Sequence, residues 1–351
     1  MNERWNLDSL YHGFSDPNFT GDLQALKVAC GRFDTFTKSL EEMDPAHALR
    51  QGVESLEEIA RLVNQLAEYA SLRQAADTGD AEANSAMGQV MAVYSQCAGA
   101  DARFQAYAAE LPNLDALLEA DELLRQYQFY FRQVREGSRY LLGSQGEDIM
   151  ARMQLSGSSA WSDLQAYLTS TVEVDYDGGI TNLSAIRNLA YDGNPAVRKA
   201  AYEAELACYD KIKDSVAFAL NSIKLETINA AQLRGYESPL DKALKGARMQ
   251  RATLDAMFAA IDEYLPKFWA YLKAKAKALG HENGLPWYDL FAPMGTSGKT
   301  YTTEEARDYL LNLFGQFDTE LRDMVAEAFA NAWIDFFPRP GKTGGAFCAG
   351  I

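Results

Sequence analysis

Histidine is scarce in this chain, and its copies stand far apart. Among 351 residues the histidines are His12, His47 and His281. The H-E-x-x-H motif of helical zinc sites needs two histidines one helical turn apart, with a glutamate that activates the bound water. His281-Glu282 begins this pattern, but Leu285 occupies the position of the second histidine. Glycines and a proline flank the segment and indicate a loop, so we interpret all three histidines as surface or capping residues.

Cysteine is also rare. Cys30, Cys97, Cys208 and Cys348 contain no C-x-x-C pair, which argues against a thiol redox motif or a cysteine zinc knuckle. Four scattered cysteines in a chain of this length indicate reduced thiols in a cytosol. Residues 1–14 lack the basic start and the apolar run of a secretory signal. We therefore expect a cytoplasmic protein.

Positive charge is in short supply, and long apolar runs are missing. The chain has 33 Lys and Arg residues against 49 Asp and Glu residues, a net charge of −16. Such a surface repels a nucleic-acid backbone and an anionic membrane, and no basic cluster offsets it. No stretch approaches the length of about 18 apolar residues that a transmembrane helix needs. We therefore expect neither nucleic acid nor a membrane as a partner.

Apolar residues at helical spacing are the strongest pattern in the sequence. Ile59 and Val63 lie on one helical stripe, and Met87 and Met91 lie on another. The turn sequence DTGD at residues 77–80 separates the two stripes, which predicts an antiparallel pair of long helices. We interpret the methionines as core residues rather than as part of a cofactor site.

Several helix starts are marked by capping residues. A capping side chain precedes a proline in Asp44-Pro45, Asn194-Pro195 and Ser238-Pro239. Thr302 and Glu305 have the spacing of a capping box. The helices expected after residue 200 carry amphipathic stripes of the type found in helix bundles. These stripes are Tyr209, Ile212, Val216, Leu220 and Ile223; Leu254, Phe258, Ile261, Leu265 and Phe268; and Leu310, Leu313, Phe317, Leu321 and Met324.

Strand patterns are few, so the predicted fold is mainly α with minor β. Residues 172–176 alternate between apolar and polar side chains and end at Gly178-Gly179, and residues 345–349 form a second candidate strand. Breaks near Pro112 and at Gly178-Gly179 favour three parts. These are an N-terminal helical hairpin lobe with long antiparallel helices (1–112), a second helical segment with a short strand (113–180), and a third helical part (181–351).

Four short segments spread over the chain carry a shared family pattern. They are WNLDSLY (residues 5–11), RGYESPLD (234–241), PWYDLFAP (286–293) and FPRPGKTGGAF (337–347). Taken together and in this order, they resemble oligoendopeptidase F and its relatives, the thimet-like zinc oligopeptidases. The resemblance runs along the whole chain and covers the amino-terminal portion of that family.

This resemblance implies a helical, two-lobed peptidase that cleaves short peptides inside an enclosed channel and depends on zinc. In that family the H-E-x-x-H motif and a third glutamate ligand follow the glycine-rich strand, whereas this sequence reaches Ile351 before them. Residues 181–351 would then be the incomplete first part of a catalytic domain. We therefore expect no catalytic residues, no metal ligands and no bound zinc in this chain, and no hydrolysis by the chain alone.

The glycine-rich segment carries the site residues that the resemblance assigns. Gly344, Gly345, Ala346 and Phe347 would form an edge strand that pairs its backbone with an extended peptide substrate. The glycines would leave room for the substrate backbone. The alternative is that the glycines only shape a bulge or a bend.

Two functions from different classes stay open. The chain is either the amino-terminal part of a zinc oligopeptidase, with the missing C-terminal half as its partner, or a non-catalytic helical binding or scaffold protein derived from such a peptidase. The first predicts exposed apolar surface at Trp333, Ile334, Phe336 and Phe337, which promotes association. The second predicts a monodisperse protein that unfolds cooperatively.

Overall fold

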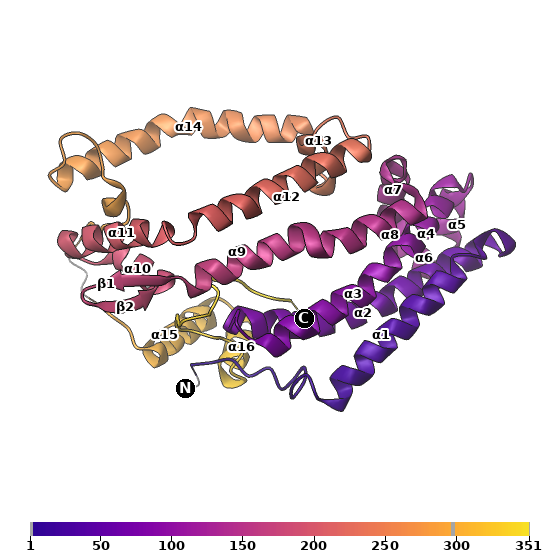
Figure 1. Cartoon of the computed structure of the whole chain (residues 1–351), viewed down its shortest axis with the longest axis horizontal. Coiled ribbons are helices and arrows are strands. Elements are labelled where there is room, and N and C mark those ends of the chain that lie inside the picture. The colour runs from indigo at the N-terminus through magenta and orange to yellow at the C-terminus, as the bar shows by residue number, and fades with distance from the viewer. Residues whose placement is uncertain (1–2, 296–298, 351) are drawn as a thin grey trace.

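The computed structural model describes residues 3–295 and 299–350, and helices dominate it (Figure 1). The α-helices are α1 (Pro17–Phe36), α2 (Pro45–Ala76), α3 (Ala81–Tyr94), α4 (Ala98–Glu110), α5 (Leu114–Ala120), α6 (Glu122–Gln126), α7 (Gln128–Gly137), α8 (Gly143–Gln154), α9 (Ala160–Thr171), α10 (Leu183–Asn188), α11 (Pro195–Tyr209), α12 (Lys213–Leu233), α13 (Pro239–Gly246), α14 (Arg251–Ala278), α15 (Thr303–Phe317) and α16 (Thr319–Ala330). Short helical turns are η1 (Leu40–Glu42), η2 (Ser95–Cys97), η3 (Ser138–Tyr140), η4 (Leu155–Ser159), η5 (Leu189–Tyr191) and η6 (Trp287–Asp289). The strands are β1 (Glu173–Tyr176) and β2 (Gly179–Asn182). The predicted fold class, mainly α with minor β, is confirmed.

The helices predicted from capping residues begin where the sequence indicates. Asp44, Asn194 and Ser238 each accept a hydrogen bond from an amide in the first turn of α2, α11 and α13. Thr302 and Glu305 form the predicted capping box at the start of α15. The predicted pair of long helices is confirmed as α2 packed against α3, with the expected turn at residues 77–80 between them.

The main apolar core lies in the amino-terminal lobe, which we define as residues 11–134. Phe104 on α4 is fully buried there, and its ring centroid lies 6.1 Å from that of Phe33 on α1. A Cβ atom on Gly52 of α2 would lie 2.1 Å from the Phe104 ring, so glycine is required for α2 to pass this close. The three-part domain division stays a prediction.

Strands β1 and β2 pair as an antiparallel hairpin, with Val174 opposite Thr181. The turn residues Asp177 and Gly178 have φ values of 51° and 77°, the left-handed conformation that a two-residue hairpin turn requires. The strand predicted at residues 172–176 is confirmed. The strand predicted at residues 345–349 is wrong, because no other segment of the described chain pairs with it to form a ladder.

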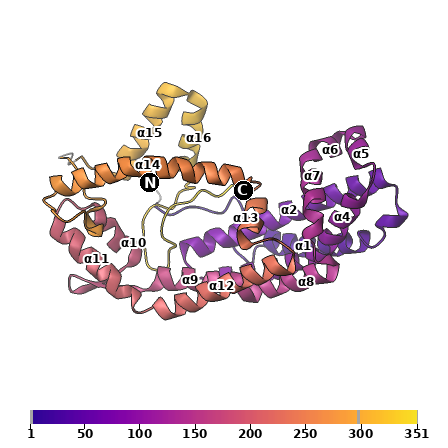
Figure 2. The ribbon, with the colours of Figure 1, turned by 90° about the horizontal axis from the view of Figure 1, so that it is seen from above.

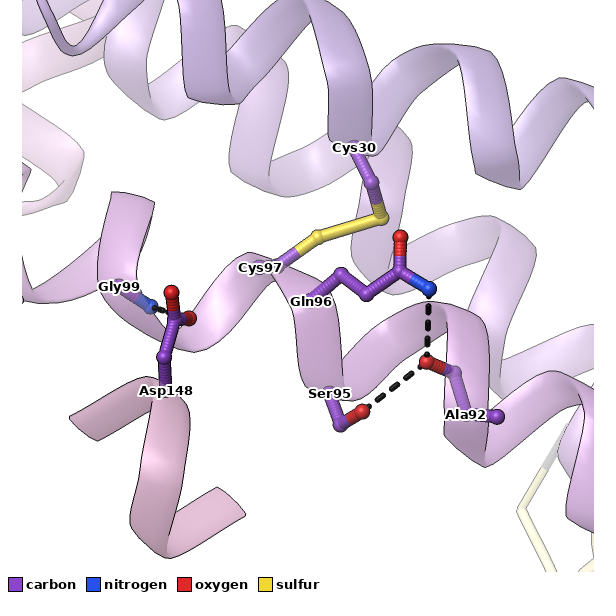
Figure 3. The surroundings of a disulfide bond; sticks show 7 residues. All are labelled: Cys30, Ala92, Ser95, Gln96, Cys97, Gly99 and Asp148. Atoms are coloured by element: carbon purple, nitrogen blue, oxygen red, sulfur yellow. Dashed lines mark hydrogen bonds between the residues drawn. A yellow bond between two sulfur atoms is a disulfide. The ribbon is translucent and has the colours of Figure 1, made fainter. Parts of the chain in front are cut away.

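Two cysteines are joined by a disulfide, which corrects the expectation of four reduced thiols. Cys30 on α1 is bonded to Cys97 in η2, with their Cα atoms 5.6 Å apart (Figure 3). The two cysteines are 67 residues apart in sequence, so their pairing becomes visible only when α1 packs against the junction of α3 and α4. Cys208 is a buried free thiol and Cys348 is an exposed one.

The carboxyl-terminal helices are far more open than the amino-terminal lobe. Of α14, only Lys275 and Ala276 are buried, and neither α15 nor α16 contains a buried residue. Figure 2 shows α15 and α16 projecting together from the other elements, and α14 running apart from α12. Even so, within the described ranges none of the helices has the length and apolar content needed to cross a membrane.

The apolar stripes predicted after residue 200 are helical, but they are not buried as in a bundle. The stripe at residues 209–223 is divided between α11 and α12 by a short break. Exposed fractions reach 53% for Leu220, 53% for Phe258 and 85% for Phe317. The prediction of bundle packing is therefore wrong for the exposed parts of these faces, whereas Ile212 is buried in a second core cluster against which Tyr209 and Val216 pack.

Candidate functional site

The predicted peptide-binding segment, residues 344–347, follows a firmly anchored stretch of chain. The Gly341 carbonyl accepts a hydrogen bond from the Thr78 amide at 2.8 Å. The Thr343 amide donates to the Ala75 carbonyl at 2.9 Å. Both partners lie where α2 ends and the α2–α3 turn begins. The segment therefore leaves the helical hairpin of the amino-terminal lobe at a fixed point.

Gly341 sets the position where this stretch crosses between two helices. Its amide donates to the Ser170 carbonyl near the end of α9 at 3.2 Å. Its φ is 80°, and a Cβ atom there would lie 2.7 Å from a carboxylate oxygen of Asp77. Any other residue would be strained and would collide with that side chain. The crossing therefore depends on glycine.

The two glycines of the predicted segment have different local roles. A Cβ atom on Gly344 would lie 2.8 Å from the Ser184 hydroxyl at the start of α10, so glycine allows a close passage. Gly345 has a φ of 93° with open space around the missing Cβ, so there the backbone conformation requires glycine. Residues 344–347 are all exposed. The local roles fit the alternative that the glycines shape a bend, and the substrate role stays a prediction.

The opening of the chain lies beside this segment. The rings of Trp5 and Phe347 meet edge to face, with their centroids 6.3 Å apart. The Asn6 amide donates to the Ala332 carbonyl at 2.7 Å. Two of the segments that carry the family resemblance, at residues 5–11 and 337–347, therefore lie side by side. Sequence spacing could not reveal this contact, because more than 300 residues separate them.

A buried ion-pair cluster fixes the bend before the glycines. The Asp335 side chain is 2% exposed and accepts two hydrogen bonds from the Arg339 guanidinium, at 2.8 and 2.9 Å. The Lys342 ammonium also bonds to this carboxylate. Burial raises the pKa of Asp335, but the hydrogen bonds from the two cations outweigh it and leave the pKa below its usual range.

A large cavity opens between the chain's first described residues, the end of α2 and residues 335–340. Its volume is about 1170 Å³, and its lining includes Arg73 and Arg339. Arg73 is paired with Asp80 at 2.7 Å, and Arg339 is paired with Asp335. These two cations are therefore already neutralised by carboxylates of the protein.

A second polar centre lies where α11 meets the loop after α14. Asp289 is 2% exposed and accepts a hydrogen bond from Nε of Arg198 at 2.8 Å. Nε2 of His281 lies 2.6 Å from the other carboxylate oxygen. Burial raises the pKa of Asp289, but the bonds to His281 and Arg198 leave it below its usual range. A cavity of about 340 Å³ adjoins this centre.

This geometry corrects one interpretation of the histidines. His12 and His47 are exposed, as expected. His281 instead hydrogen-bonds to a buried carboxylate, so its interpretation as a surface or capping residue is wrong. It does lie in a loop, as predicted. The sequence contained one usable signal, the PWYDLFAP segment that holds Asp289, but nothing in it marked His281 as the partner.

A third polar contact braces the junction between α8 and α9. The Glu226 carboxylate on α12 accepts hydrogen bonds from the Ser158 amide at 2.6 Å and from its hydroxyl at 2.7 Å. The preceding Gly157 leaves helical geometry, and a Cβ atom there would lie 2.3 Å from the same carboxylate. The sequence analysis did not predict this break, although the Ser-Gly-Ser-Ser run at residues 156–159 is a pattern that interrupts helices.

The described residues do not offer the donors that zinc requires. Across residues 3–295 and 299–350, no group of three or more His, Cys, Asp or Glu side chains could hold a metal ion, whereas a catalytic zinc site uses three protein ligands. His281 and Asp289 make a pair, but the Arg198 guanidinium already binds that carboxylate. A cation in this position opposes the binding of a second one.

Two solved structures, of an oligoendopeptidase-F and of a PZ peptidase, share this fold. The oligoendopeptidase-F from Enterococcus faecium superposes with a TM-score of 0.72 at 19% identity, covering 91% of this chain and 67% of that one. PZ peptidase A, solved with an inhibitor, superposes with a TM-score of 0.72 at 14% identity, covering 92% of this chain and 56% of that one. At these identities the likeness establishes the fold.

Sequence comparison places the chain in a family. Residues 188–351 match the model of peptidase family M3, and residues 108–173 match the model of oligopeptidase F. The chain belongs to the oligopeptidase F group of peptidase family M3, which confirms the predicted resemblance. It is 25% identical to oligopeptidase PepF of Bacillus subtilis over 99% of its own length and 52% of that protein. It is 23% identical to a plasmid-encoded oligoendopeptidase F of Lactococcus lactis, over 99% of its own length and 58% of that protein. The chain thus spans about half the length of the curated relatives it matches.

Proposed function

We propose that residues 1–351 are the amino-terminal part of a zinc-dependent oligopeptidase that cleaves short peptides inside an enclosed channel. In this proposal the zinc ligands and the general base belong to a part of the protein outside residues 1–351. The observation that carries the proposal is the family match along 99% of this chain, which accounts for only 52% of the length of the Bacillus relative.

The exposed apolar surface supports this proposal. Trp333 and Phe337 are 47% and 48% exposed, as predicted, whereas Ile334 and Phe336 are half-buried. On α14, Phe268 and Trp269 are 61% and 54% exposed. Large exposed apolar side chains, when they gather on a surface, mark places that pack against another polypeptide. The remaining part of the peptidase would cover them.

Within that enzyme, residues 344–347 would hold the peptide substrate. No backbone hydrogen bond from this segment to another part of the described chain is formed, so its amides and carbonyls are available for strand addition. The anchors at Gly341 and Thr343 would fix its direction. A peptide held through its backbone is gripped without regard to its side chains, which suits an enzyme that cleaves many short peptides.

The test compares residues 1–351 with a protein extended over the length of the relatives. The extended protein should bind one zinc ion and cleave a quenched-fluorescence peptide, and a chelator should abolish the cleavage. Residues 1–351 alone should do neither. Chelator-sensitive hydrolysis by residues 1–351 would overturn the assignment of the catalytic centre to another part of the protein.

The substrate role of residues 344–347 has its own test in the extended protein. Ala346→Pro removes one backbone donor and should raise KM for the peptide about tenfold. Ala346→Ser keeps the amide and should leave KM unchanged. Equal KM values for the two variants would count against strand addition at this segment.

The second candidate is a non-catalytic helical binding or scaffold protein derived from such a peptidase. The closed core of the amino-terminal lobe favours it, because the fully buried members of this core cluster all lie within residues 11–134. Residues 1–351 should then be monodisperse and unfold in one cooperative transition. Aggregation that is relieved by adding the remaining part of the peptidase would decide for the first candidate.

The cytoplasmic location expected from the sequence is also kept as a proposal. The Cys30–Cys97 disulfide speaks against it, because disulfides seldom persist in a reducing cytosol. Thiol trapping in fractionated cells, followed by mass spectrometry, would locate the protein and report its oxidation state together.

A further inference from the structure

We infer that the Cys30–Cys97 disulfide is a redox-controlled staple of the amino-terminal lobe, and that thiol–disulfide exchange reaches it only when α1 detaches locally. The redox state of the surroundings would then set how firmly α1 is held, while the rest of the lobe stays folded. This inference does not depend on the proposed peptidase function, since it concerns a core that the described residues complete themselves.

The first observation is the burial of both sulfur-bearing residues. Cys30 and Cys97 are each 5% exposed, and both belong to the apolar core of the amino-terminal lobe. Figure 3 shows the disulfide between α1 and the short turn that leads into α4. An external thiol must approach a disulfide sulfur directly to attack it. In the closed lobe the surrounding side chains block that approach.

The second observation is a set of hydrogen bonds from Arg103 on α4 to Asp34 and Thr37 at the end of α1, which we call the polar latch. Nη2 of Arg103 on α4 lies 2.5 Å from a carboxylate oxygen of Asp34, one turn after Cys30 on α1. Nε of Arg103 donates to the hydroxyl of Thr37 at 3.2 Å. The latch and the disulfide therefore hold α1 against the η2–α4 region at neighbouring points. Opening α1 at Cys30 requires the Arg103 contacts to loosen as well.

The third observation is that the other side of the staple is fixed independently. The Gly99 amide at the start of α4 donates to the Asp148 carboxylate on α8 at 2.8 Å (Figure 3). Arg103 also bonds to the Ser144 hydroxyl through Nη1 at 2.5 Å, so this second tie is shared with the latch, whereas the Gly99 bond does not involve Arg103. The segment that carries Cys97 is thus tied to α8 without the disulfide. In this proposal local opening moves α1 rather than η2, and it must also part the buried side chains of α1 from α2 and α3.

The chemistry is an exchange with an external thiol or disulfide. A dithiothreitol thiolate bonds to the sulfur of Cys97, the bond between Cys97 and Cys30 breaks, and the departing Cys30 thiolate takes a proton from water. The second dithiothreitol thiol then displaces Cys97, which leaves two cysteine thiols and one cyclic disulfide. Glutathione disulfide drives the reverse reaction and is itself reduced to two thiols.

Thiol counting tests whether the staple forms and opens. After equilibration with glutathione disulfide, alkylation in denaturant should label two of the four cysteines, Cys208 and Cys348. After full reduction it should label all four, and the Tm should fall by about 5 °C while the far-ultraviolet spectrum stays helical. Cys208→Ala/Cys348→Ala should keep this response, and Cys30→Ser/Cys97→Ser should lose it. Four labelled cysteines under oxidising conditions would overturn the inference.

The rate of reduction tests the gating by α1. Dithiothreitol should reduce the folded protein about 100-fold more slowly than the urea-unfolded chain. Arg103→Met removes the latch and should speed reduction of the folded protein about tenfold. Lys27→Met, which removes an exposed cation from α1, the helix that carries Cys30, serves as the control and should leave the rate unchanged. Equal reduction rates for folded and unfolded wild type, or for the two methionine variants, would overturn the gating.

Discussion

The amino-terminal lobe and the α14–α16 region are both helical, yet they differ in what happens to their apolar side chains. In the lobe, Phe33 and Phe104 are 1% and 0% exposed. In α14 and α15, Phe268 and Phe317 are 61% and 85% exposed. Helical spacing of apolar residues therefore establishes a helix in both regions, but it establishes a core in only one of them.

The difference shows which region of the chain forms a buried apolar core from the described residues. The lobe closes its core with contacts among α1, α2, α3 and α4 and adds the Cys30–Cys97 disulfide. The α15–α16 pair packs mainly against itself. A helix in this second situation has backbone hydrogen bonds but little apolar burial, which is the main favourable term in folding. Truncation of an apolar side chain should accordingly cost much more stability in the lobe than in α14–α16.

The largest expected effect is the loss of a core aromatic ring. Phe104→Ala should lower the free energy of unfolding by about 3–5 kcal/mol, because it leaves a cavity among Phe33, Phe131 and the backbone of Gly52. The measurement is urea denaturation followed by circular dichroism. Phe317→Ala is the matched control and should change the value by less than about 0.5 kcal/mol. Similar losses for the two variants would erase the distinction between the regions.

The sequence predicted local structure well and long-range contacts poorly. The stripes of Ile59 and Met87 and the caps at Asp44 and Thr302 depend on spacing within one or two turns, so the helices could be predicted. Whether a stripe is buried depends on another segment facing it, which spacing does not encode. Phe317 shows this limit, since its stripe resembles a core stripe and is exposed.

The candidate site shows the same limit. The glycines at residues 344 and 345 were identified from the sequence, but the contact of Trp5 with Phe347 joins residues from opposite ends of the chain. The pairing of His281 with Asp289 depends on how a loop folds back after α14. These contacts follow from tertiary packing, and no local pattern encodes them.

A buried charge should have the next largest effect, this time in the carboxyl-terminal part. Asp335→Asn should cost about 3 kcal/mol, because it leaves Arg339 and Lys342 without their buried counter-charge. Asp323→Asn, at an exposed pair with Arg322, is the control and should cost under about 0.5 kcal/mol. The readout is the urea midpoint at pH 7. A small effect at Asp335 would mean that the bend before the glycines is held by other contacts.

The dependence of stability on pH should differ in sign between Asp101 in the amino-terminal lobe and Asp335 in the segment after α16, with a smaller effect. Burial raises the pKa of Asp101 on α4 to about 6, against a hydrogen bond from Gln105. Its contribution to stability is full below the unfolded pKa of about 4 and is lost as the pH rises through 6. The pKa of Asp335 is lowered, so its contribution is present above about pH 4 and is lost as the pH falls through its folded pKa.

Asp101→Asn tests the pH dependence of stability that is expected from Asp101 in the amino-terminal lobe. Its urea midpoint should rise relative to wild type between pH 4 and pH 7, by an amount on the order of 1 kcal/mol, since the variant has no charge to bury. The urea midpoint of the Asp335→Asn variant should instead fall further below that of wild type as the pH rises from acid to neutral. Parallel pH profiles for Asp101→Asn and wild type would show that Asp101 titrates like an exposed carboxyl group.

The smallest effect on stability should come from the most exposed aromatic face. Phe268→Ser on α14 should change the free energy of unfolding by less than about 0.5 kcal/mol, because the 61% exposed ring gives up little burial on unfolding. The same change should reduce self-association, which sedimentation velocity measures, because it removes apolar surface from an uncovered helix. A variant that unfolds as easily as Phe104→Ala would show that α14 is packed in solution. A variant with unaltered stability and unaltered association would show instead that the aromatic surface of α14 does not drive contact between chains.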